Sequence, residues 1–268
     1  MTRPATPVVL KLGGRALDAP GAVPEFAAAL AALARPAIVV HGGGAEVTAW
    51  CTKLGIASRF EGGLRVTDDA TLEVATAVLA GLANKRMVAA LRAAGVDAVG
   101  LAALDGGVLQ VRPHAQAAAL GAVGEVTGAD VSLLDALLAQ GRTPVLASIA
   151  ATTDGRLLNV NADDAASALA TAVGAPDLVL LSDTPGLRLD GEVVSTLRAP
   201  EFAATLAHPQ VEGGMKPKLA GAIAAATHGV ARVHIAAWRG PDTLHGLLVT
   251  RTHGTCVTAA LPEEALHG

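Results

Sequence analysis

Tyrosine is absent from the 268-residue sequence, and aromatic residues make up only 2% of it. Its apolar content, 51% in all, is instead dominated by alanine. Small side chains favour close packing of helices on sheets, although a GC-rich genome leaves the same bias. Charged residues are also sparse, at 16%. This composition is typical of a globular protein and excludes intrinsic disorder.

Several features of other protein classes are missing too. No uncharged apolar run of about 18 residues occurs, so we expect no membrane contact. The N-terminal stretch MTRPATPVVLKLGG lacks the apolar core and cleavage site of a signal peptide, which predicts a cytoplasmic protein. A net charge of -4 argues against nucleic-acid binding. Cys51 and Cys256 lack metal-ligand spacing, and we expect two small hydrophobic residues, not a disulfide.

Short β-branched runs alternate with Ala- and Leu-rich helical stretches along most of the chain. The expected strands are Val8–Leu12, Ala37–His41, Ala98–Leu101, Thr143–Ser148, Leu157–Val160, Leu178–Leu181, Arg232–Ala236 and Thr255–Val257. The expected helices are Val23–Ala34, Gly44–Leu54, Asp68–Ala94 with a break at Gly81, Ser132–Gln140, Ala162–Val173 and Met215–Gly229. This alternation predicts an α/β body with a mostly parallel sheet and helices on both faces.

Glycine and proline mark the expected hairpins. One lies around Arg59–Thr67, and tight turns fall at Asp154-Gly155 and Asp190-Gly191. The segment from Asp105 to Thr127 is broken by four glycines and a proline, and we expect its hairpins to form a lid beside a site. No linker divides the chain, so two halves of one body are expected to flank a cleft.

Two glycine-rich loops follow neighbouring strands. KLGG at 11–14 ends the first strand, and HGGG at 41–44 ends the second and opens a helix. Ligands of open α/β sheets bind at the carboxyl ends of strands, and glycine N–H groups at a helix start attract anions. Neither the G-x-G-x-x-G fingerprint nor the P-loop motif occurs, which argues against a Rossmann oxidoreductase. The loops predict a cleft that handles phosphate.

Three further polar features point to an acidic substrate and a charged site. Arg65 lies in the first hairpin, and arginine pairs with carboxylates in a bidentate manner. Asn159 and Asn161 alternate off a strand end and share a face, with Asn161 placed to cap the next helix. GGMKPK at 213–218 sets lysines at a helix N-terminus, where the helix dipole favours an anion to compensate them.

Taken in order, the motifs KLGG, HGGG, GLRVTD, GEVTG, NVNAD, LSDTPG and GGMKPK resemble those of the bacterial acetylglutamate kinases of the amino acid kinase family. The resemblance runs from about Val8 to the final strand. It implies a carbamate kinase-like αβα sandwich around a mostly parallel eight-stranded sheet, in a single domain over residues 1–268. An N-terminal lobe, about residues 1–174, would hold the acidic substrate, and a C-terminal lobe, about residues 175–268, would hold ATP.

The resemblance also implies roles for single residues. Lys11 and Lys218 match the lysines on the transferring phosphoryl group, and Asp163 matches the acid that orients both. The matches to the substrate-binding residues are Gly43, Gly44, Arg65, Asn159 and Asn161. The matches to the ATP-binding residues are Gly13, Gly14, Ser182, Asp183, Thr184, Pro185, Gly186, Leu187, Arg188, Gln210, Val211 and Glu212.

The implied activity is ATP-dependent phosphorylation of the side-chain carboxylate of N-acetyl-L-glutamate, the second step of arginine biosynthesis. Mg²⁺ would be held mainly by the ATP phosphates, with no metal ligands and no tightly bound cofactor from the protein. The carboxylate is ionised near pH 7, so the reaction needs positioning and positive charge but no general base. The alternatives are an acetylaminoadipate kinase of lysine synthesis and a non-catalytic nucleotide or metabolite sensor on the same fold.

The resemblance further bears on assembly. Arginine-inhibited members of the family share an extra N-terminal helix that interlaces dimers into a hexamer. Here Met1–Pro7 precede the first strand, and two prolines among seven residues disfavour a helix. We therefore expect a homodimer with weak or no arginine inhibition.

Overall fold

The computed structural model describes residues 6–13 and 19–260, and its centre is an eight-stranded sheet. In spatial order the strands are β14 (Thr196–Arg198), β16 (Thr255–Thr258), β15 (Arg232–Ala237), β11 (Asp177–Ser182), β1 (Val8–Leu12), β2 (Ala37–His41), β8 (Thr143–Ala147) and β5 (Ala98–Ala102). Every neighbouring pair is parallel except β15 and β16. The expected mostly parallel sheet of eight strands is confirmed.

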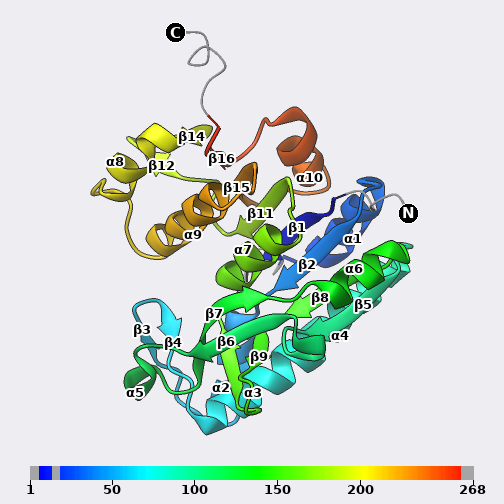
Figure 1. Ribbon diagram of the computed structural model, residues 1–268, viewed down its shortest axis with the longest axis vertical. Coiled ribbons are helices and arrows are strands. Elements are labelled where there is room, and N and C mark those ends of the chain that lie inside the picture. Colours follow the sequence, from blue (N-terminus) through cyan, green and yellow to red (C-terminus); the bar gives the residue numbers. More distant parts are fainter. Residues whose placement is uncertain (1–5, 14–18, 261–268) are drawn as a thin grey trace.

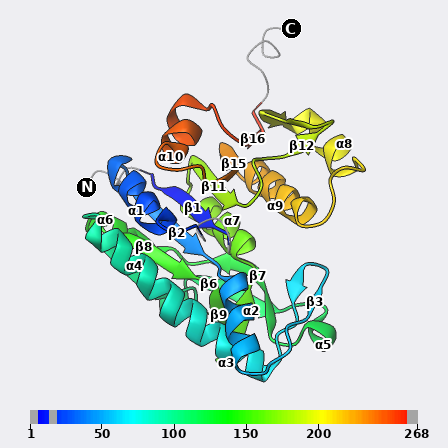
Figure 2. The same cartoon turned by 180° about the vertical axis from the view of Figure 1, so that it is seen from behind.

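Helices cover both faces of this sheet (Figures 1 and 2). One face carries α1 (Ala22–Ala32), α4 (Asn84–Ala93) and α10 (Thr243–His245), which continues into the π-helical η4 (Gly246–Thr250). The other face carries α6 (Ser132–Ala139), α7 (Ala162–Ala172) and α9 (Met215–Thr227), with η3 (Ala199–Glu201) and α8 (Phe202–Leu206) beside α9. Three layers result, which confirms the αβα sandwich.

The alternation of side chains along β1 decides which layer each residue meets. Val8, Leu10 and Leu12 pack in the core with α1, whereas Val9 packs in the core with α7. Successive side chains of a strand point to opposite faces, so Lys11 lies on the α7 side together with Val9. A lysine is thereby buried at the carboxyl end of the central strand.

A second, four-stranded sheet lies beside the carboxyl ends of the central strands. Its order is β6 (Leu109–Pro113), β7 (Val123–Ala129), β10 (Leu157–Val160) and β9 (Ile149–Ala151). The segment expected to form a lid is β6, the short helix α5 (Ala117–Leu120) and most of β7. β7 is hydrogen-bonded in parallel to β10, with Val123 opposite Asn159. The expected hairpin is confirmed, because β6 and β7 pair antiparallel, and the role of this segment as a lid stays a prediction.

Residues Asp69–Ala93 form one continuous helical run. It consists of α3 (Asp69–Thr76), the π-helical η1 (Ala77–Ala83) and α4, so the break expected at Gly81 is a π-helical turn instead. A π turn keeps the backbone hydrogen-bonded, so no interruption is needed. Within the described residues this is the one helix that could cross a membrane by length and composition alone, and 39% of its most apolar window is buried. Core helices pass the same test, and α4 packs on β5, β8 and α1.

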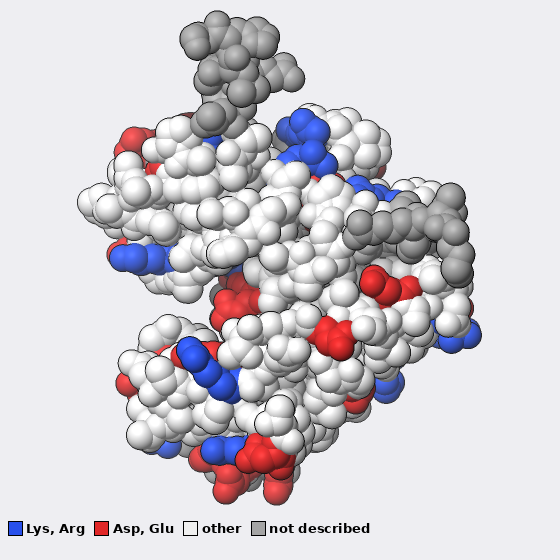
Figure 3. Space-filling view, in the orientation of Figure 1, with Lys and Arg blue, Asp and Glu red and all other residues white. Residues whose placement is uncertain are grey.

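The molecule has two lobes with a hollow between them. Figure 1 shows α8, α9 and the β12 (Arg188–Leu189) and β13 (Glu192–Val193) hairpin in one lobe. The other holds α2 (Gly44–Lys53), α3 and the hairpin of β3 (Phe60–Glu61) and β4 (Leu64–Arg65). In the space-filling view the surface is hollowed between the lobes, with acidic side chains at its inner end (Figure 3). The central sheet runs through both lobes, because β1 pairs with β2 on one side and β11 on the other.

Candidate active site

Two lysines from distant parts of the chain share one aspartate at the inner end of the hollow. Lys11 Nζ, from β1, lies 2.7 Å from Asp163 Oδ1. Lys218 Nζ, from the first turn of α9, donates a hydrogen bond of 2.7 Å to Asp163 Oδ2. The structure thus brings together all three residues that the sequence predicts to be catalytic. Each carboxylate oxygen is occupied by a different ammonium group, so Asp163 fixes both cations at once.

Burial and charge act in opposite directions on this triad. Burial alone would raise the pKa of Asp163, but Lys11 and Lys218 outweigh it and hold that pKa below its ordinary value. Burial lowers the pKa of Lys11 despite the attraction of Asp163, and the second ammonium lowers it further. Two positive charges against the one negative charge of Asp163 leave the triad with an excess of one, and burial raises the pKa of Asp164, a further acid on the cleft wall. An anion entering the cleft would be attracted to the triad.

Local structure places Asp163 where the triad needs it. Asn161 is the N-cap of α7, and its Oδ1 accepts a 2.7 Å hydrogen bond from the Asp163 backbone N–H. An acid in the first helical turn is also favoured by the helix dipole. Asn161 therefore has a structural role in addition to its place on the wall of the cleft.

The two glycine loops meet the cleft in different ways. The Gly13 N–H donates to Leu181 O at 2.8 Å, so this donor is already used, although Gly13 lines the cleft. A Cβ on Gly13 would lie 2.8 Å from Leu181 O, which explains why glycine is needed there. Gly43 and Gly44 start α2 and line a small pocket. Gly14, also expected to bind ATP, lies outside the described residues.

Arg65 is a buried guanidinium at the wall of that small pocket. Its Nη2 donates to Gly44 O at 2.7 Å and to Thr48 Oγ1 at 2.8 Å, and its Nη1 donates to Ser58 Oγ at 3.1 Å. The guanidinium carbon also lies 4.7 Å from the Phe60 ring centroid. Burial lowers the pKa of Arg65, and among the described residues no aspartate or glutamate pairs with it. A buried cation without a counterion is costly, so a bound carboxylate would be stabilised here.

The small pocket has a volume of about 180 Å³, and Asn159 lines it together with Arg65. Asn159 Nδ2 donates to Thr67 Oγ1 at 3.2 Å, and Thr67 Oγ1 donates to Arg65 O at 2.9 Å. The two residues expected to bind substrate are thus linked through one threonine. Drug-sized ligands occupy roughly 300–1,000 Å³, so this pocket suits a smaller molecule, of amino-acid size.

A larger cleft of about 1,530 Å³ adjoins this pocket and contains the triad. Of the residues expected to bind ATP, Ser182, Asp183, Thr184 and Glu212 line it. Ser182 Oγ lies 3.1 Å from Thr184 Oγ1, which folds this loop into a tight turn at the end of β11.

Gly13 also lines the cleft, whereas the other described residues expected to bind ATP are not on its wall. Leu187 and Val211 are buried in the apolar core, Arg188 donates to Gly191 O, and Gln210 hydrogen-bonds Asp190. Gly186 packs against Thr255, where a Cβ would lie 2.7 Å from Thr255 Oγ1, and Pro185 precedes it in the same loop. These side chains shape the loops around the cleft instead of facing it.

Sequence reasoning missed the polar partners of Arg65 and Asn159. Thr48, Ser58 and Thr67 orient these two side chains, yet each is a common residue in no recognisable motif. One signal could have identified Thr48. It follows Gly44 by four residues in α2, and positions i and i+4 of a helix share a face.

Comparisons with known proteins agree with this geometry. The model of the amino acid kinase family matches residues 6–237. An acetylglutamate kinase of Chloroflexus aurantiacus is 41% identical over 248 residues, which cover 92% of this chain and 96% of that protein. The crystal structure of smu.665 from Streptococcus mutans UA159 has a TM-score of 0.80 at 25% identity, covering 94% of this chain and 98% of that one. Giardia carbamate kinase has the same fold, with a TM-score of 0.72 at 16% identity over 96% of this chain and 99% of that one. The chain therefore belongs to the amino acid kinase family.

Proposed function

We propose that the protein transfers the γ-phosphoryl group of ATP to the side-chain carboxylate of N-acetyl-L-glutamate and forms N-acetylglutamyl 5-phosphate. The observation that carries this proposal is the position of the Lys11–Asp163–Lys218 triad. It lies in a cleft large enough for a nucleotide, and that cleft adjoins a small pocket whose Arg65 has no acidic partner among the described residues. The identity to acetylglutamate kinases over nine-tenths of the chain supports the choice of substrate.

The acidic substrate would bind in the small pocket through Arg65. A guanidinium has five N–H donors, and Arg65 uses three of them on Gly44 O, Thr48 Oγ1 and Ser58 Oγ. Among the described residues its Nε–H and one Nη1–H therefore remain for a carboxylate. N-acetylglutamate has two carboxylates. One would pair with Arg65 and Asn159, and the other would point past Gly44 toward Lys11.

The triad would then stabilise the negative charge on the γ-phosphoryl oxygens during the transfer from ATP to the acid. Phosphoryl transfer spreads charge over the equatorial oxygens, and fixed cations stabilise that charge. Lys11 and Lys218 are the fixed cations. Each ammonium nitrogen lies 2.7 Å from a different carboxylate oxygen of Asp163, which keeps the two lysines in place. The acceptor carboxylate is already ionised, so no residue has to remove a proton from it.

ATP would lie along the larger cleft, with Ser182, Asp183, Thr184 and Glu212 at its wall. The two lysines fit the phosphates of such a nucleotide, as does the Gly43 N–H, which donates to no backbone carbonyl among the described residues. Mg²⁺ would be carried by the ATP phosphates and would add positive charge to them. In this arrangement the N-terminal lobe, about residues 1–174, holds the acid, and the C-terminal lobe, about residues 175–268, holds the nucleotide.

The test is a set of initial rates of ADP release with N-acetylglutamate, glutamate and acetylaminoadipate as acceptors. We expect N-acetylglutamate to have the highest kcat/KM, by about tenfold or more over the acid that is one methylene longer. A higher kcat/KM for acetylaminoadipate would replace the proposed substrate. ATP binding without turnover of any acid would favour a sensor.

We also propose a cytoplasmic homodimer that acts in arginine biosynthesis. An isologous pair is the commonest closed assembly of identical chains. Apolar residues at the surface, such as Leu54, Leu82 and Val249, offer faces that a second copy could cover. Light scattering on the purified protein, with and without millimolar arginine, measures the assembly. A monomer or a hexamer would contradict the homodimer.

A further inference from the structure

A buried polar pair outside the triad has no place in the mechanism described above. His41 is the last residue of β2, and Asn84 is the first residue of α4. Both are buried, with exposed fractions of 4% and 0%. Asn84 Nδ2 lies 3.1 Å from His41 Nε2. Because buried polar groups are costly unless they are hydrogen-bonded in a defined way, such a pair restricts the conformation of whatever it touches.

The neighbours of Asn84 fix the orientation of its amide. Its Nδ2 lies 2.9 Å from Val145 O and 3.2 Å from Leu101 O, and its Oδ1 accepts from Lys85 Nζ at 3.1 Å. The reverse orientation would set an amide oxygen against two carbonyl oxygens and an amide nitrogen against an ammonium group. Gly100 leaves room for the amide, because a Cβ there would lie 2.1 Å from Asn84 Oδ1. The amide nitrogen has two hydrogens for three acceptor atoms, so one hydrogen is shared, and Asn84 turns the N–H side of its amide toward His41.

The donor from Asn84 decides where the proton of His41 lies. An Nε2 that accepts a hydrogen bond has no proton, so the neutral ring carries its proton on Nδ1. His41 Nδ1 donates that proton to Gly42 O at 2.9 Å. Burial lowers the pKa of His41, and Lys85 lowers it further against the opposing influences of the Gly42 carbonyl and Glu46. The ring is therefore neutral at pH 7.

The Gly42 carbonyl belongs to the same peptide plane as the Gly43 N–H. A trans peptide directs its C=O and N–H to opposite sides, so anchoring the carbonyl also aims the N–H. The side chain of His41 lies on the same face of β2 as those of Ala37 and Val39, which pack in the core with α4. The Gly43 N–H is thereby directed away from the His41 ring, and Gly43 lines the small pocket that adjoins the cleft with the triad. Among the described residues, this N–H donates to no backbone carbonyl.

The π-helical segment before Asn84 braces the same loop. Its Leu79 lies against Gly43, where a Cβ would be 2.7 Å from Leu79 Cδ2. In a π-helix hydrogen bonds join residues five apart, so Leu79 and Asn84 lie close to one face, whereas an α-helix would separate them. The π turn thus lets one helix contact the glycine loop at two points.

We propose that Asn84 is a positioning residue, which through the Nδ1–H tautomer of His41 anchors the Gly42 carbonyl and aims the Gly43 N–H at the transferring phosphoryl group. This proposal rests on the proposed phosphoryl transfer. Asn84 and His41 touch no substrate in it. They set the direction of a backbone donor that the reaction uses.

The first test reads the tautomer directly and needs no activity. Imidazole ¹⁵N NMR of histidine-labelled protein at pH 7, with the His41 signal assigned by its loss in His41→Asn, reports which ring nitrogen carries the proton. We expect a protonated Nδ1 and an unprotonated Nε2. An Nε2–H ring or an imidazolium would overturn the proposal, whether or not the protein proves to be a kinase.

The second test compares His41→Asn with His41→Leu. The amide nitrogen of asparagine can take the place of Nδ1 and donate to Gly42 O, whereas leucine cannot. We expect kcat of His41→Leu to fall roughly 10- to 100-fold, as for a misplaced catalytic group, and His41→Asn to restore most of it. KM for the acid should change less than kcat, since Arg65 is untouched. Equal kcat values for the two variants would overturn the proposal.

The third test uses Asn84→Asp, which keeps the shape but replaces the donor by a carboxylate. A carboxylate beside the ring raises the pKa of His41, so the acid limb of the kcat profile should move to higher pH. Glu46 and Lys85, the other charged groups near the ring, are unchanged.

The matched control is Asp177→Asn, a buried polar change distant from the cleft, which should leave kcat per folded molecule and the pH profile unchanged. An Asn84→Asp profile identical to wild type would contradict the proposal. If the wild-type protein phosphorylates none of the acids, the proposed function is wrong. The NMR measurement of the His41 tautomer does not depend on that outcome.

Discussion

At the residue scale, the central feature is one carboxylate shared by two ammonium groups. Asp163 is 2.7 Å from both Lys11 and Lys218, and burial lowers the pKa of Lys11. Removing one lysine would leave Asp163 and a single cation, a neutral pair with no excess positive charge. The site would then lose its attraction for an anionic phosphoryl group.

We therefore expect Lys11→Met and Lys218→Met to lower kcat by about 10³-fold, comparable to the loss of an arginine that stabilises phosphoryl transfer in other enzymes. KM for either substrate should rise much less, because these cations act most strongly on the transition state. Steady-state kinetics on the two variants measures both constants. A Lys11→Met enzyme with near-normal kcat would remove Lys11 from the mechanism.

Arg65 gives a second prediction at this scale. Arg65→Lys keeps the charge but loses the planar fork that holds Gly44 O, Thr48 and Ser58 at once. We expect KM for the acidic substrate to rise about tenfold or more, since one charge-assisted hydrogen bond contributes about 1.5–3 kcal/mol. KM for ATP should barely change. An equal rise in both constants would show that Arg65 does not serve the acid alone.

Single residues were predictable where their chemistry is distinctive. A lysine at a strand end, a lone arginine in a hairpin and an asparagine before a helix all lie where the sequence places them. Thr48, Ser58 and Asn84 were not predictable as site residues. Their roles depend on contacts with Arg65 and His41, which are distant in sequence. These contacts arise only when β2, α4 and the first hairpin are packed together.

At the element scale, the two glycine loops differ in how much an added side chain disturbs them. A Cβ on Gly13 would meet the backbone oxygen of Leu181 at 2.8 Å, and that oxygen is fixed in β11. A Cβ on Gly43 would meet only the end of the Leu79 side chain. Gly43 is close to extended, so its backbone can accept another residue.

Gly13→Ala should therefore be the more damaging change, and no second substitution should repair it. Gly43→Ala should cost about 1–3 kcal/mol of stability from overpacking, and Leu79→Ala should recover part of the lost activity in the double variant. Urea unfolding and kcat for the three glycine-loop variants form the comparison. If the losses of stability and kcat in the double variant are the sum of those in the two single variants, the inferred contact between Gly43 and Leu79 is contradicted.

Most long elements follow from local sequence, and the short ones do not. The strands β1 and β2 are apolar, largely β-branched runs bounded by turns, and their predicted ends agree with the structure. Elements β14, α8 and α10 span only three to five residues and were not predicted. Such short pieces form because the sheet edge and α9 hold them, so the local pattern contains little signal. The π turn at Ala77–Ala83 likewise looks like ordinary helix in sequence.

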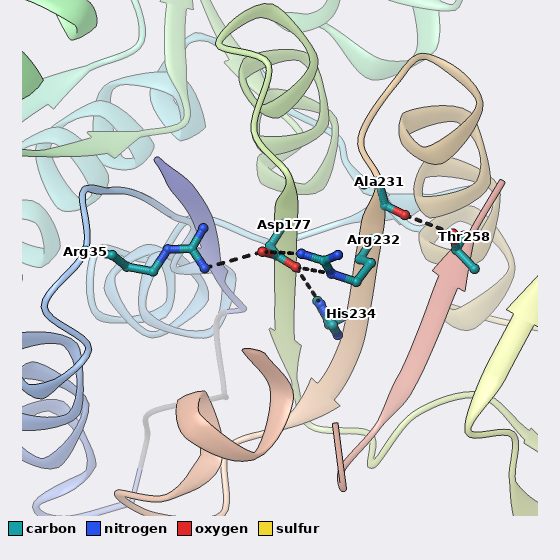
Figure 4. A network of polar contacts seen from close by, with 6 residues as sticks. All are labelled: Arg35, Asp177, Ala231, Arg232, His234 and Thr258. Carbon is teal, nitrogen blue, oxygen red and sulfur yellow. Dashed lines mark hydrogen bonds and ion pairs between the residues drawn. The ribbon is translucent and has the colours of Figure 1, made fainter. Parts of the chain in front are cut away.

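At the scale of the whole molecule, a buried charge cluster fastens the two lobes at the edge opposite the cleft. Asp177 begins β11, and Arg232 pairs with both of its oxygens at 2.7 and 3.0 Å (Figure 4). Arg35, which precedes β2, lies 3.4 Å from the same carboxylate, and His234 Nε2 lies 3.2 Å from it. The cluster joins the amino ends of strands from both halves. It is distant from the triad, which lies at the carboxyl ends.

Asp177→Asn should lower the free energy of unfolding at pH 7 by about 3 kcal/mol, as expected when one member of a buried ion pair is removed. Hydrogen bonds and ion pairs with His234 and Arg232 overcome the effect of burial and hold the pKa of Asp177 below its ordinary value. That contribution is present above the unfolded pKa, about 3.9, and is lost as pH falls below it. The difference between wild type and variant should therefore shrink below about pH 4. Denaturation curves at pH 7 and pH 3 test this, and a constant difference would contradict the assignment.

The central claim is that an ionised carboxylate attacks the γ-phosphorus of ATP directly. ³¹P NMR of the reaction with N-acetylglutamate ¹⁸O-labelled in its side-chain carboxylate tests this most directly, because ¹⁸O bonded to phosphorus shifts the phosphorus signal. The account predicts an acyl phosphate whose bridging oxygen is ¹⁸O, formed in step with ADP. Inorganic phosphate carrying only unlabelled oxygen, released without an acyl phosphate, would contradict it.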